Sequence, residues 1–236
     1  MKKLIIANWK CNPTSLLEVQ DIFTKIKQGL KSDKKDQVII CPPFVYLVLL
    51  KGLTLGAQDV YFEEKGPFTG AISPLMLKDL GVEYVIIGHS ERRIYFKETN
   101  QIINKKIKKC LESGLKVIFC IGESLKDRKA GKKTNVLKSQ IKIGLDGVKN
   151  FENIFIAYEP VWAIGTGKNC SVKETISACR FIRNFLSKPI RVLYGGSVNS
   201  FNATLYLKEN EINGLLVGGA SLKPEEFLRI VYSIEN

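Results

Sequence analysis

Residues 154–159 read Ile154-Phe155-Ile156-Ala157-Tyr158-Glu159, an unbroken apolar run that ends on a carboxylate. A strand exposed on one face alternates apolar with polar residues, whereas a strand covered on both faces is apolar throughout. The run is therefore typical of a parallel strand inside an α/β protein, and we expect a strand over Ile154–Tyr158. Glu159 follows at the carboxyl end of that strand, the end at which ligand sites of α/β proteins lie.

Similar runs recur along the chain, separated by helical patterns. We expect further strands over Leu4–Asn8, Val38–Cys41, Thr54–Ala57, Tyr84–Ile87, Lys116–Cys120, Ile190–Tyr194 and Gly214–Val217. No linker, repeat or low-complexity tract interrupts the alternation of strands and helices. This pattern predicts an α/β fold in which residues 1–236 form a single (β/α)₈ barrel domain, with eight parallel strands surrounded by helices. An open doubly wound sheet is the alternative. Its usual glycine-rich turn after the first strand is replaced here by Asn8-Trp9-Lys10-Cys11-Asn12.

Three helix starts carry capping signals. Ser15 and Ser171 are each followed three residues later by a glutamate, Glu18 and Glu174, which predicts a capping box at both. Lys223-Pro224-Glu225-Glu226 predicts the start of the last helix, because proline and acidic residues suit a first turn.

The composition is that of a globular protein, with 45% hydrophobic residues and a formal net charge of +13. No apolar run approaches the ~18 residues of a membrane-spanning helix, and Leu4–Ala7 is too short for the core of a signal peptide. We therefore expect the cytosol. The lysines of residues 105–109, interrupted by Ile107, predict an exposed helix face, and we expect no nucleic-acid partner. A positive field also attracts anionic metabolites.

The cysteines predict packing residues rather than a metal or disulfide site. All six are scattered without a Cys-x-x-Cys pair, and His89 is the only histidine. We expect neither a metal nor a cofactor.

Polar and glycine residues follow five of the expected strands directly. They are Asn8 and Lys10 at the end of the first strand, His89 and Glu91 after the fourth, Glu159 after the sixth, Ser197 after the seventh, and Gly218 and Gly219 after the eighth. A single such residue is more often a packing or capping residue. Clusters at the same end of five strands predict one active site at the carboxyl end of the barrel.

Six stretches also carry a family resemblance: Ala7-Asn8-Trp9-Lys10, Ile87-Gly88-His89-Ser90-Glu91-Arg92-Arg93, Cys120-Ile121-Gly122-Glu123, Ala157-Tyr158-Glu159-Pro160-Val161-Trp162-Ala163-Ile164-Gly165-Thr166-Gly167-Lys168, Tyr194-Gly195-Gly196-Ser197-Val198 and Leu216-Val217-Gly218-Gly219-Ala220-Ser221. In these stretches, in their order and over nearly its whole length, the chain resembles the triosephosphate isomerase family.

The resemblance implies interconversion of dihydroxyacetone phosphate and D-glyceraldehyde 3-phosphate in glycolysis and gluconeogenesis. Glu159 would be the base that moves a proton between neighbouring carbons. Lys10, Asn8 and a neutral His89 would polarise the substrate oxygens, with a helix N-terminus after His89 keeping the imidazole neutral. Glu91 would hold the Lys10 ammonium, although an acid at a helix start is the alternative interpretation. Phosphate would bind to backbone N–H groups of Gly165, Ser197, Gly218 and Gly219.

The resemblance also implies a lid that begins at Pro160 and has its tip at Ala163–Gly167. Its second hinge, Lys168-Asn169-Cys170, departs from the Lys-Thr-Ala that is common in the family. Gly165–Lys168 is similar to part of a nucleotide-binding P-loop, but that motif needs a glycine where Trp162 stands.

A homodimer is implied as well. Gly66–Ala71 resembles the loop that inserts into the partner subunit, which would bring Thr69 near Lys10 of the partner subunit. Pro67 and Ala71 replace the usual alanine and glutamate, so the interface ion pairs of the family are not expected here.

Two other classes of protein are considered. Barrel aldolases need a Schiff-base lysine inside a strand or a metal site, and none of the expected strands offers either. A catalytically silent binding protein on the same scaffold would have lost Glu159, Lys10 or His89, and the chain retains all three.

Overall fold

A computed structural model describes residues 2–165 and 169–233. Within them, eight parallel strands close into a barrel in chain order, β8 pairing with β1. The strands are β1 (Leu4–Asn8), β2 (Val38–Cys41), β3 (Thr54–Ala57), β4 (Tyr84–Ile87), β5 (Lys116–Ile121), β6 (Ile154–Tyr158), β7 (Arg191–Tyr194) and β8 (Gly214–Val217). The expected barrel is confirmed, with β5 one residue longer and β7 one residue shorter than the sequence pattern predicts.

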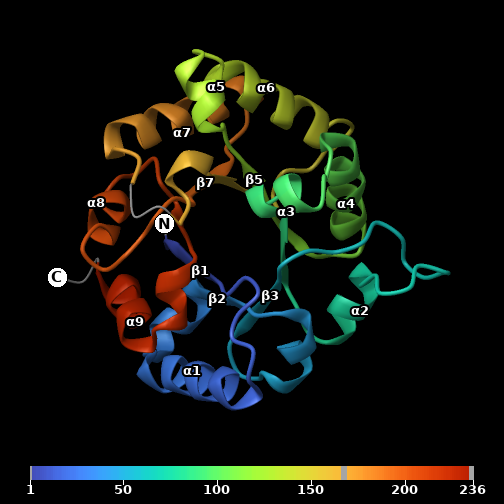
Figure 1. The fold of residues 1–236 in the computed structure, drawn as a ribbon, viewed down its shortest axis with the longest axis vertical. Coiled ribbons are helices and arrows are strands. Elements are labelled where there is room, and N and C mark those ends of the chain that lie inside the picture. Colours follow the sequence, from blue (N-terminus) through green and yellow to red (C-terminus); the bar gives the residue numbers. More distant parts are fainter. Residues whose placement is uncertain (1, 166–168, 234–236) are drawn as a thin grey trace.

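Helices surround the barrel (Figure 1). The α-helices are α1 (Leu16–Gly29), α2 (Pro74–Asp79), α3 (Ser90–Tyr95), α4 (Asn100–Glu112), α5 (Leu125–Lys129), α6 (Lys133–Gly144), α7 (Val172–Leu186), α8 (Ala203–Leu207) and α9 (Pro224–Tyr232). Short 3₁₀ helices are η1 (Ser32–Gln37), η2 (Phe44–Leu49), η3 (Val161–Ala163) and η4 (Gly219–Leu222). None of the described helices has the length and apolarity needed to cross a membrane.

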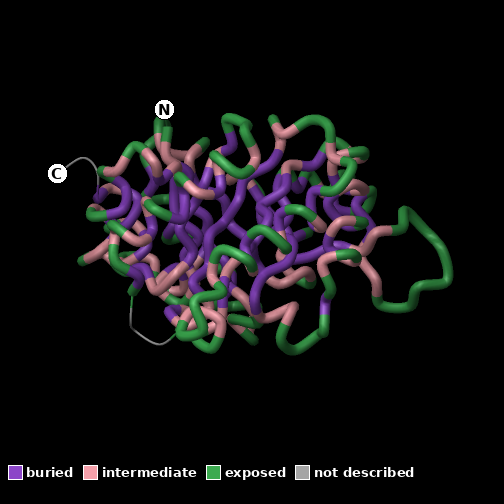
Figure 2. Tube along the Cα trace, turned by 90° about the horizontal axis from the view of Figure 1, so that it is seen from above, coloured by how far each residue is buried: buried purple, intermediate pink, exposed green. Residues whose placement is uncertain are grey.

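The strands are buried on both faces, which explains their unbroken apolar sequences (Figure 2). Successive side chains point to opposite faces, so Phe155 and Ala157 belong to a small core cluster while Ile154 and Ile156 pack in the larger cluster with the helices. The same alternation carries Glu159 to the face of Phe155 and Ala157. The end of β6 therefore presents its carboxylate at the mouth of the barrel.

The capping predictions hold only in part. Ser15 precedes α1, but its side chain makes no capping bond, so the predicted capping box is wrong there. Ser171 does cap α7, where its hydroxyl accepts the N–H of Glu174 at 3.3 Å, while the Glu174 carboxylate binds Arg128. Pro224 occupies the first turn of α9 as expected.

The lysines of residues 105–109 do not all lie on an exposed face, so that prediction is wrong for Lys106. Lys106 is buried in α4, with its ammonium 2.7 Å from Asp59 and 2.6 Å from Glu98. Arg92 contacts the same two carboxylates at 2.9 and 2.6 Å. A buried ammonium is tolerated only when it is paired. Glu98 lies just before α4, whereas Asp59 comes from the distant segment that follows β3.

All six cysteines are free. Five are buried, as expected of packing residues, whereas Cys11 is exposed. Burial raises the pKa of the Cys170 thiol to about 11.

Candidate active site

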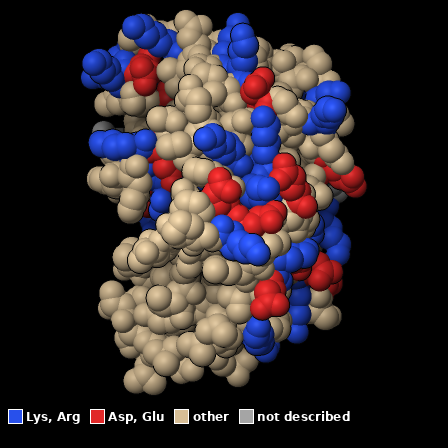
Figure 3. Space-filling model, turned by 90° about the vertical axis from the view of Figure 1, so that its right-hand side faces the viewer, with Lys and Arg blue, Asp and Glu red and all other residues tan. Residues whose placement is uncertain are grey.

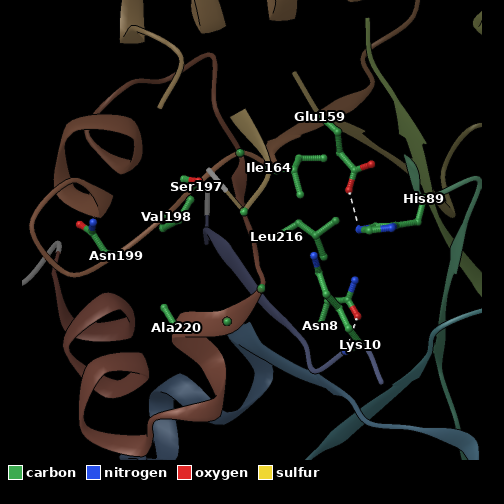
Figure 4. Close-up of a pocket in the computed structure, with 15 residues that line it drawn as sticks. Asn8, Lys10, His89, Glu159, Ile164, Ser197, Val198, Asn199, Leu216 and Ala220 are labelled. Carbon is green, nitrogen blue, oxygen red and sulfur yellow. Dashed lines mark hydrogen bonds and ion pairs between the residues drawn. The ribbon is translucent and has the colours of Figure 1, made fainter. Parts of the chain in front are cut away.

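A cavity of about 280 Å³ opens at the carboxyl ends of the strands. The predicted site residues that line it are Asn8, Lys10, His89, Glu159, Gly165, Ser197, Gly218 and Gly219. Glu159 and His89 lie on one side of the cavity, and Ser197 and Ala220 lie on the other (Figure 4). Residues that stand at the ends of different strands in the sequence therefore line the same cavity.

Glu159 is almost fully buried, with 2% of its surface exposed. Its Oε1 lies 3.1 Å from Nε2 of His89, and its Oε2 accepts the backbone N–H of Ser90 at 3.1 Å. The backbone of Glu159 passes close to Gly122, where a Cβ atom would lie 1.6 Å from the Glu159 carbonyl oxygen. Only glycine allows this approach of the two strand ends. Beside the carboxylate, burial and then the charge of Glu159 raise the pKa of Cys120 well above its ordinary value.

His89 immediately precedes α3 and acts as its N-cap. Its Nδ1 accepts the N–H of Glu91 at 3.2 Å, so Nδ1 carries no proton in this arrangement. The proton of a neutral ring is then on Nε2, which faces Glu159. This arrangement places an N–H donor of the ring, at Nε2, opposite the Glu159 carboxylate.

Lys10 is held by contacts at both its backbone and its ammonium. Its φ is 55°, a left-handed conformation that is rare outside glycine. The Lys10 N–H donates to Oδ1 of Asn8 at 3.1 Å, and Nζ pairs with Oε1 of Glu91 at 2.6 Å. Glu91 does not line the cavity but contacts it through Lys10.

Two supporting residues were missed by the sequence analysis. Gln58 donates from Nε2 to the carbonyl oxygens of Lys10 (2.8 Å) and Cys41 (2.9 Å). Arg93 donates to the carbonyl oxygen of Gly88 at 2.7 Å, which holds the turn before His89. Gln58 directly follows β3, so its place after a strand end was a signal that could have found it. Ile164, from the expected lid tip, also lines the cavity. Lining residues without a predicted role are Gly195, Gly196, Val198, Asn199, Leu216 and Ala220.

The described part of the expected lid begins at Pro160 and continues into η3. Trp162 donates from Nε1 to Oε1 of Glu123 at 3.2 Å, and the Arg128 guanidinium lies 4.6 Å from the centroid of its ring. Glu123 is fully buried and also accepts the Tyr158 hydroxyl at 3.1 Å. Residues 166–168, which hold the last two residues of the expected tip and the first residue of the second hinge, lie outside the described residues.

Within residues 2–165 and 169–233 no group of three His, Cys, Asp or Glu side chains could hold a metal ion.

Comparison with known proteins agrees with this geometry. The family model described as triosephosphate isomerase matches residues 3–234. The chain belongs to the triosephosphate isomerase family. The triosephosphate isomerase of Dictyoglomus thermophilum is 47% identical, and the alignment covers 98% of this chain and 99% of that protein. The triosephosphate isomerase of Aquifex aeolicus is 45% identical over 99% of this chain and all of that protein. The chain is accordingly an enzyme, an isomerase of triose phosphates, built as a (β/α)₈ barrel.

Proposed function

We propose that the chain interconverts dihydroxyacetone phosphate and D-glyceraldehyde 3-phosphate through an enediolate, with Glu159 carrying the proton between neighbouring carbons. The observation that carries this proposal is the 3.1 Å contact between Glu159 Oε1 and His89 Nε2. It puts a carboxylate base and an N–H donor side by side in a cavity whose far side is rich in glycine. That pairing suits a substrate with an acidic C–H bond at one end and a phosphate at the other.

Glu159 takes the proton from the hydroxyl-bearing carbon next to the carbonyl. The C–H electron pair then forms the C=C bond of the enediolate, and the carbonyl π pair moves to oxygen. Return of the proton to the former carbonyl carbon, with one hydroxyl proton passing from one oxygen to the other, gives the isomer. A positioned general base contributes about 10²–10⁴-fold to the rate. Glu159 must leave His89 and the Ser90 N–H when substrate binds, because both its oxygens are engaged in the structure.

His89 donates its Nε2 proton to the substrate oxygens as charge develops there. The bond from the Glu91 N–H to Nδ1 supports this assignment, since it fixes the tautomer. Lys10 and Asn8 stabilise the same oxygens, and Glu91 holds the Lys10 ammonium in place. Donors fixed before the reaction stabilise the enediolate without reorganising.

The substrate phosphate binds to backbone N–H groups on the far side of the cavity. The donors are those of Gly165, Ser197, Gly218 and Gly219. Gly165 has φ 69°, which favours glycine, and Gly219 opens η4. Backbone N–H groups suit a phosphate dianion because they donate hydrogen bonds from positions that the fold already fixes.

The segment from Pro160 to Cys170 closes over the bound substrate. The contacts of Trp162 with Glu123 and Arg128 support a fixed first hinge. Closure excludes water, in which the enediolate readily eliminates its phosphate.

Two copies of the chain associate through Gly66–Ala71, with Thr69 near Lys10 of the partner subunit. This loop protrudes from the barrel wall between β3 and α2 (Figures 1 and 2). Val45, which is 74% exposed, lines a hollow together with Phe44 and with Gly70 and Ala71 of this loop. A group of exposed apolar residues beside a protruding loop is typical of an interface.

We place the enzyme in the cytosol as one domain over residues 1–236, in glycolysis and gluconeogenesis. The single closed barrel supports one domain. Six free thiols suit a reducing compartment.

The test is a coupled assay of glyceraldehyde 3-phosphate isomerisation with wild type and Glu159→Gln. The glutamine keeps the shape but cannot accept a proton, so kcat should fall about 10²–10⁴-fold. Phosphoglycolate should still bind, which would show that the site is intact. Glu83→Gln is the control, because Glu83 precedes β4 and pairs with Lys116. Near-normal turnover of Glu159→Gln would show that Glu159 is not the base of the reaction.

A further inference from the structure

The guanidinium of Arg93 binds three segments that meet beside His89. Arg93 belongs to α3, and its Nε donates to the carbonyl oxygen of Gly88 at 2.7 Å. Its Nη2 donates to the carbonyl oxygen of Cys120 at 3.1 Å, and its Nη1 donates to Oδ1 of Asn100 at 2.7 Å. One planar group therefore joins the turn after β4, the strand β5 and the first residue of α4.

The bond to Cys120 lies where the pairing of β4 with β5 stops. The register of the two strands ends with Ile87 opposite Phe119, so the next residue opposite Cys120 would be Gly88. Gly88 instead turns away with a φ of 73°. A Cβ atom on it would lie 2.9 Å from Arg93 Nη2 and 3.3 Å from the Cys120 carbonyl oxygen. The guanidinium thus occupies the place in which strand pairing would have continued, and a glycine at position 88 leaves room for it.

The two carbonyl groups that Arg93 binds belong to neighbours of the proposed donor and base. Gly88 immediately precedes His89, whose Nε2 lies 3.1 Å from Oε1 of Glu159. Cys120 of β5 is paired with β6 two residues before Glu159. Because one guanidinium binds both carbonyl groups, it holds the backbone that carries His89 against the strand that pairs with β6.

The position of Arg93 is defined by hydrogen bonds to uncharged oxygens. Arg93 is partly buried, and burial lowers the pKa of its guanidinium, while the charge of Glu159 acts in the opposite direction. An arginine stays charged even so. Its donors stand in a fixed planar arrangement, so the guanidinium also fixes how far apart the Gly88 and Cys120 carbonyl oxygens lie.

We propose that Arg93 is a positioning residue for the isomerisation: its guanidinium holds the turn at Gly88 against β5 and so keeps Nε2 of His89 where charge develops on the substrate. This inference rests on the proposed function, in which His89 donates to the substrate oxygens. Arg93 does not line the cavity and acts through the backbone on either side of it. Its effect is expected on the rate, because a misplacement of about 1 Å can lower a rate about 100-fold.

The test compares Arg93→Lys with Arg183→Lys. Lysine keeps the charge but has a single donor atom in place of the planar guanidinium, so it cannot bridge two carbonyl groups in the same way. Arg183 of α7 is a matched control, because its guanidinium also donates to two carbonyl oxygens, those of Ile190 and Glu211, and to Oδ1 of Asn213. These partners lie just before β7 and β8, at the end of the barrel away from the cavity.

The kinetic measurements are the kcat and KM of isomerisation and the dissociation constants of phosphoglycolate and inorganic phosphate. Phosphoglycolate places a carboxylate where the enediolate oxygens form, whereas inorganic phosphate reports only on the far side of the cavity. We expect Arg93→Lys to lower kcat about ten- to hundredfold and to weaken phosphoglycolate, while inorganic phosphate binds as in the wild type. Arg183→Lys should leave all four quantities unchanged.

The NMR signals of the imidazole give a second readout. His89 is the only histidine, so its ring gives one set of signals that needs no assignment. These signals should shift in Arg93→Lys and stay in place in Arg183→Lys, since a loss of stability alone does not move a ring in the folded protein. Asn100→Ala removes one acceptor of the Arg93 guanidinium and should change kcat and the His89 signals in the same direction, by a smaller amount.

Wild-type kcat together with unmoved His89 signals in Arg93→Lys would overturn the inference. If Arg93→Lys does not fold, the same result in Asn100→Ala would overturn it. An equal loss of kcat in Arg183→Lys would do so as well, because it would mark a general effect of losing a bonded arginine. Failure of the proposed function has a different signature, namely isomerase activity that does not depend on Glu159.

Discussion

At the scale of single residues, the ion pair between Lys10 and Glu91 links the cavity to the start of α3. The two charged atoms are 2.6 Å apart, and the Glu91 side chain is about one third exposed. Glu91→Gln keeps an oxygen that can accept from the ammonium but removes the charge. Because partly exposed ion pairs contribute only ~0–1 kcal/mol, we expect kcat/KM to fall by at most about fivefold.

The measurement for Glu91 is the initial rate of isomerisation across substrate concentrations, with Glu83→Gln as control. Glu83 pairs with Lys116 in a similarly exposed ion pair at the other end of the barrel. A fall in kcat/KM of a hundredfold or more in Glu91→Gln would instead mean that this carboxylate acts on the substrate itself.

Much of the site could be predicted residue by residue, because its members stand directly after strand ends. The polar side chains Asn8, His89 and Glu159 needed only a correct strand assignment to be brought together. Gln58 was missed because its role depends on which backbone carbonyls β1 and β2 present to it. Lys106 was assigned to the surface because a local lysine run does not reveal which acids reach it in space.

At the scale of elements, the strands were predictable and the helix starts only in part, since Ser171 caps α7 and Ser15 does not cap α1. A strand buried on both faces begins and ends where its apolar run does, so the sequence defines its boundaries closely. Six of the eight strands match the sequence prediction at both ends. A capping box depends on weak bonds that water can replace. Ser15 has the pattern, but the start of α1 is accessible to solvent and its N–H groups need no side-chain acceptor.

This difference between caps gives a prediction for the free energy of unfolding. Ser171→Ala removes the acceptor of the Glu174 N–H and should lower that free energy by about 1 kcal/mol. Ser15→Ala removes no capping bond and should change it by less than about 0.5 kcal/mol. Urea denaturation of both variants makes the comparison, and a larger loss for Ser15→Ala would contradict the assigned caps.

At the scale of the whole molecule, charge and apolar surface are unevenly distributed. On the side seen in Figure 3, lysine, arginine and acidic residues gather in the upper and right-hand parts, and a broad lower-left part carries none. With a formal net charge of +13, two copies repel each other at long range. In the proposed dimer, association would then depend on apolar packing. Added salt should not weaken it, because salt screens the repulsion.

In the proposed dimer, Phe68 is the residue on which we expect this packing to depend most directly. It lies in the protruding loop, 37% exposed, with its ring centroid 4.9 Å from that of Tyr61. Its backbone N–H and carbonyl bond Gly66 and Ala71, so the loop has a defined shape in a single chain. A loop already ordered loses little entropy when it docks. We expect the wild type to sediment as a dimer at both low and high salt.

Phe68→Asp would bury an unpaired carboxylate in an apolar contact, a change that costs several kcal/mol. We expect monomers with sharply reduced turnover, because Thr69 would no longer support Lys10 of the partner subunit. Phe201→Asp is the control, since Phe201 is 89% exposed and lies just before α8; it should remain a fully active dimer. Sedimentation velocity and turnover are measured for all three proteins over a dilution series. A wild-type chain that sediments as a monomer at full activity would show that the barrel needs no partner to complete its site.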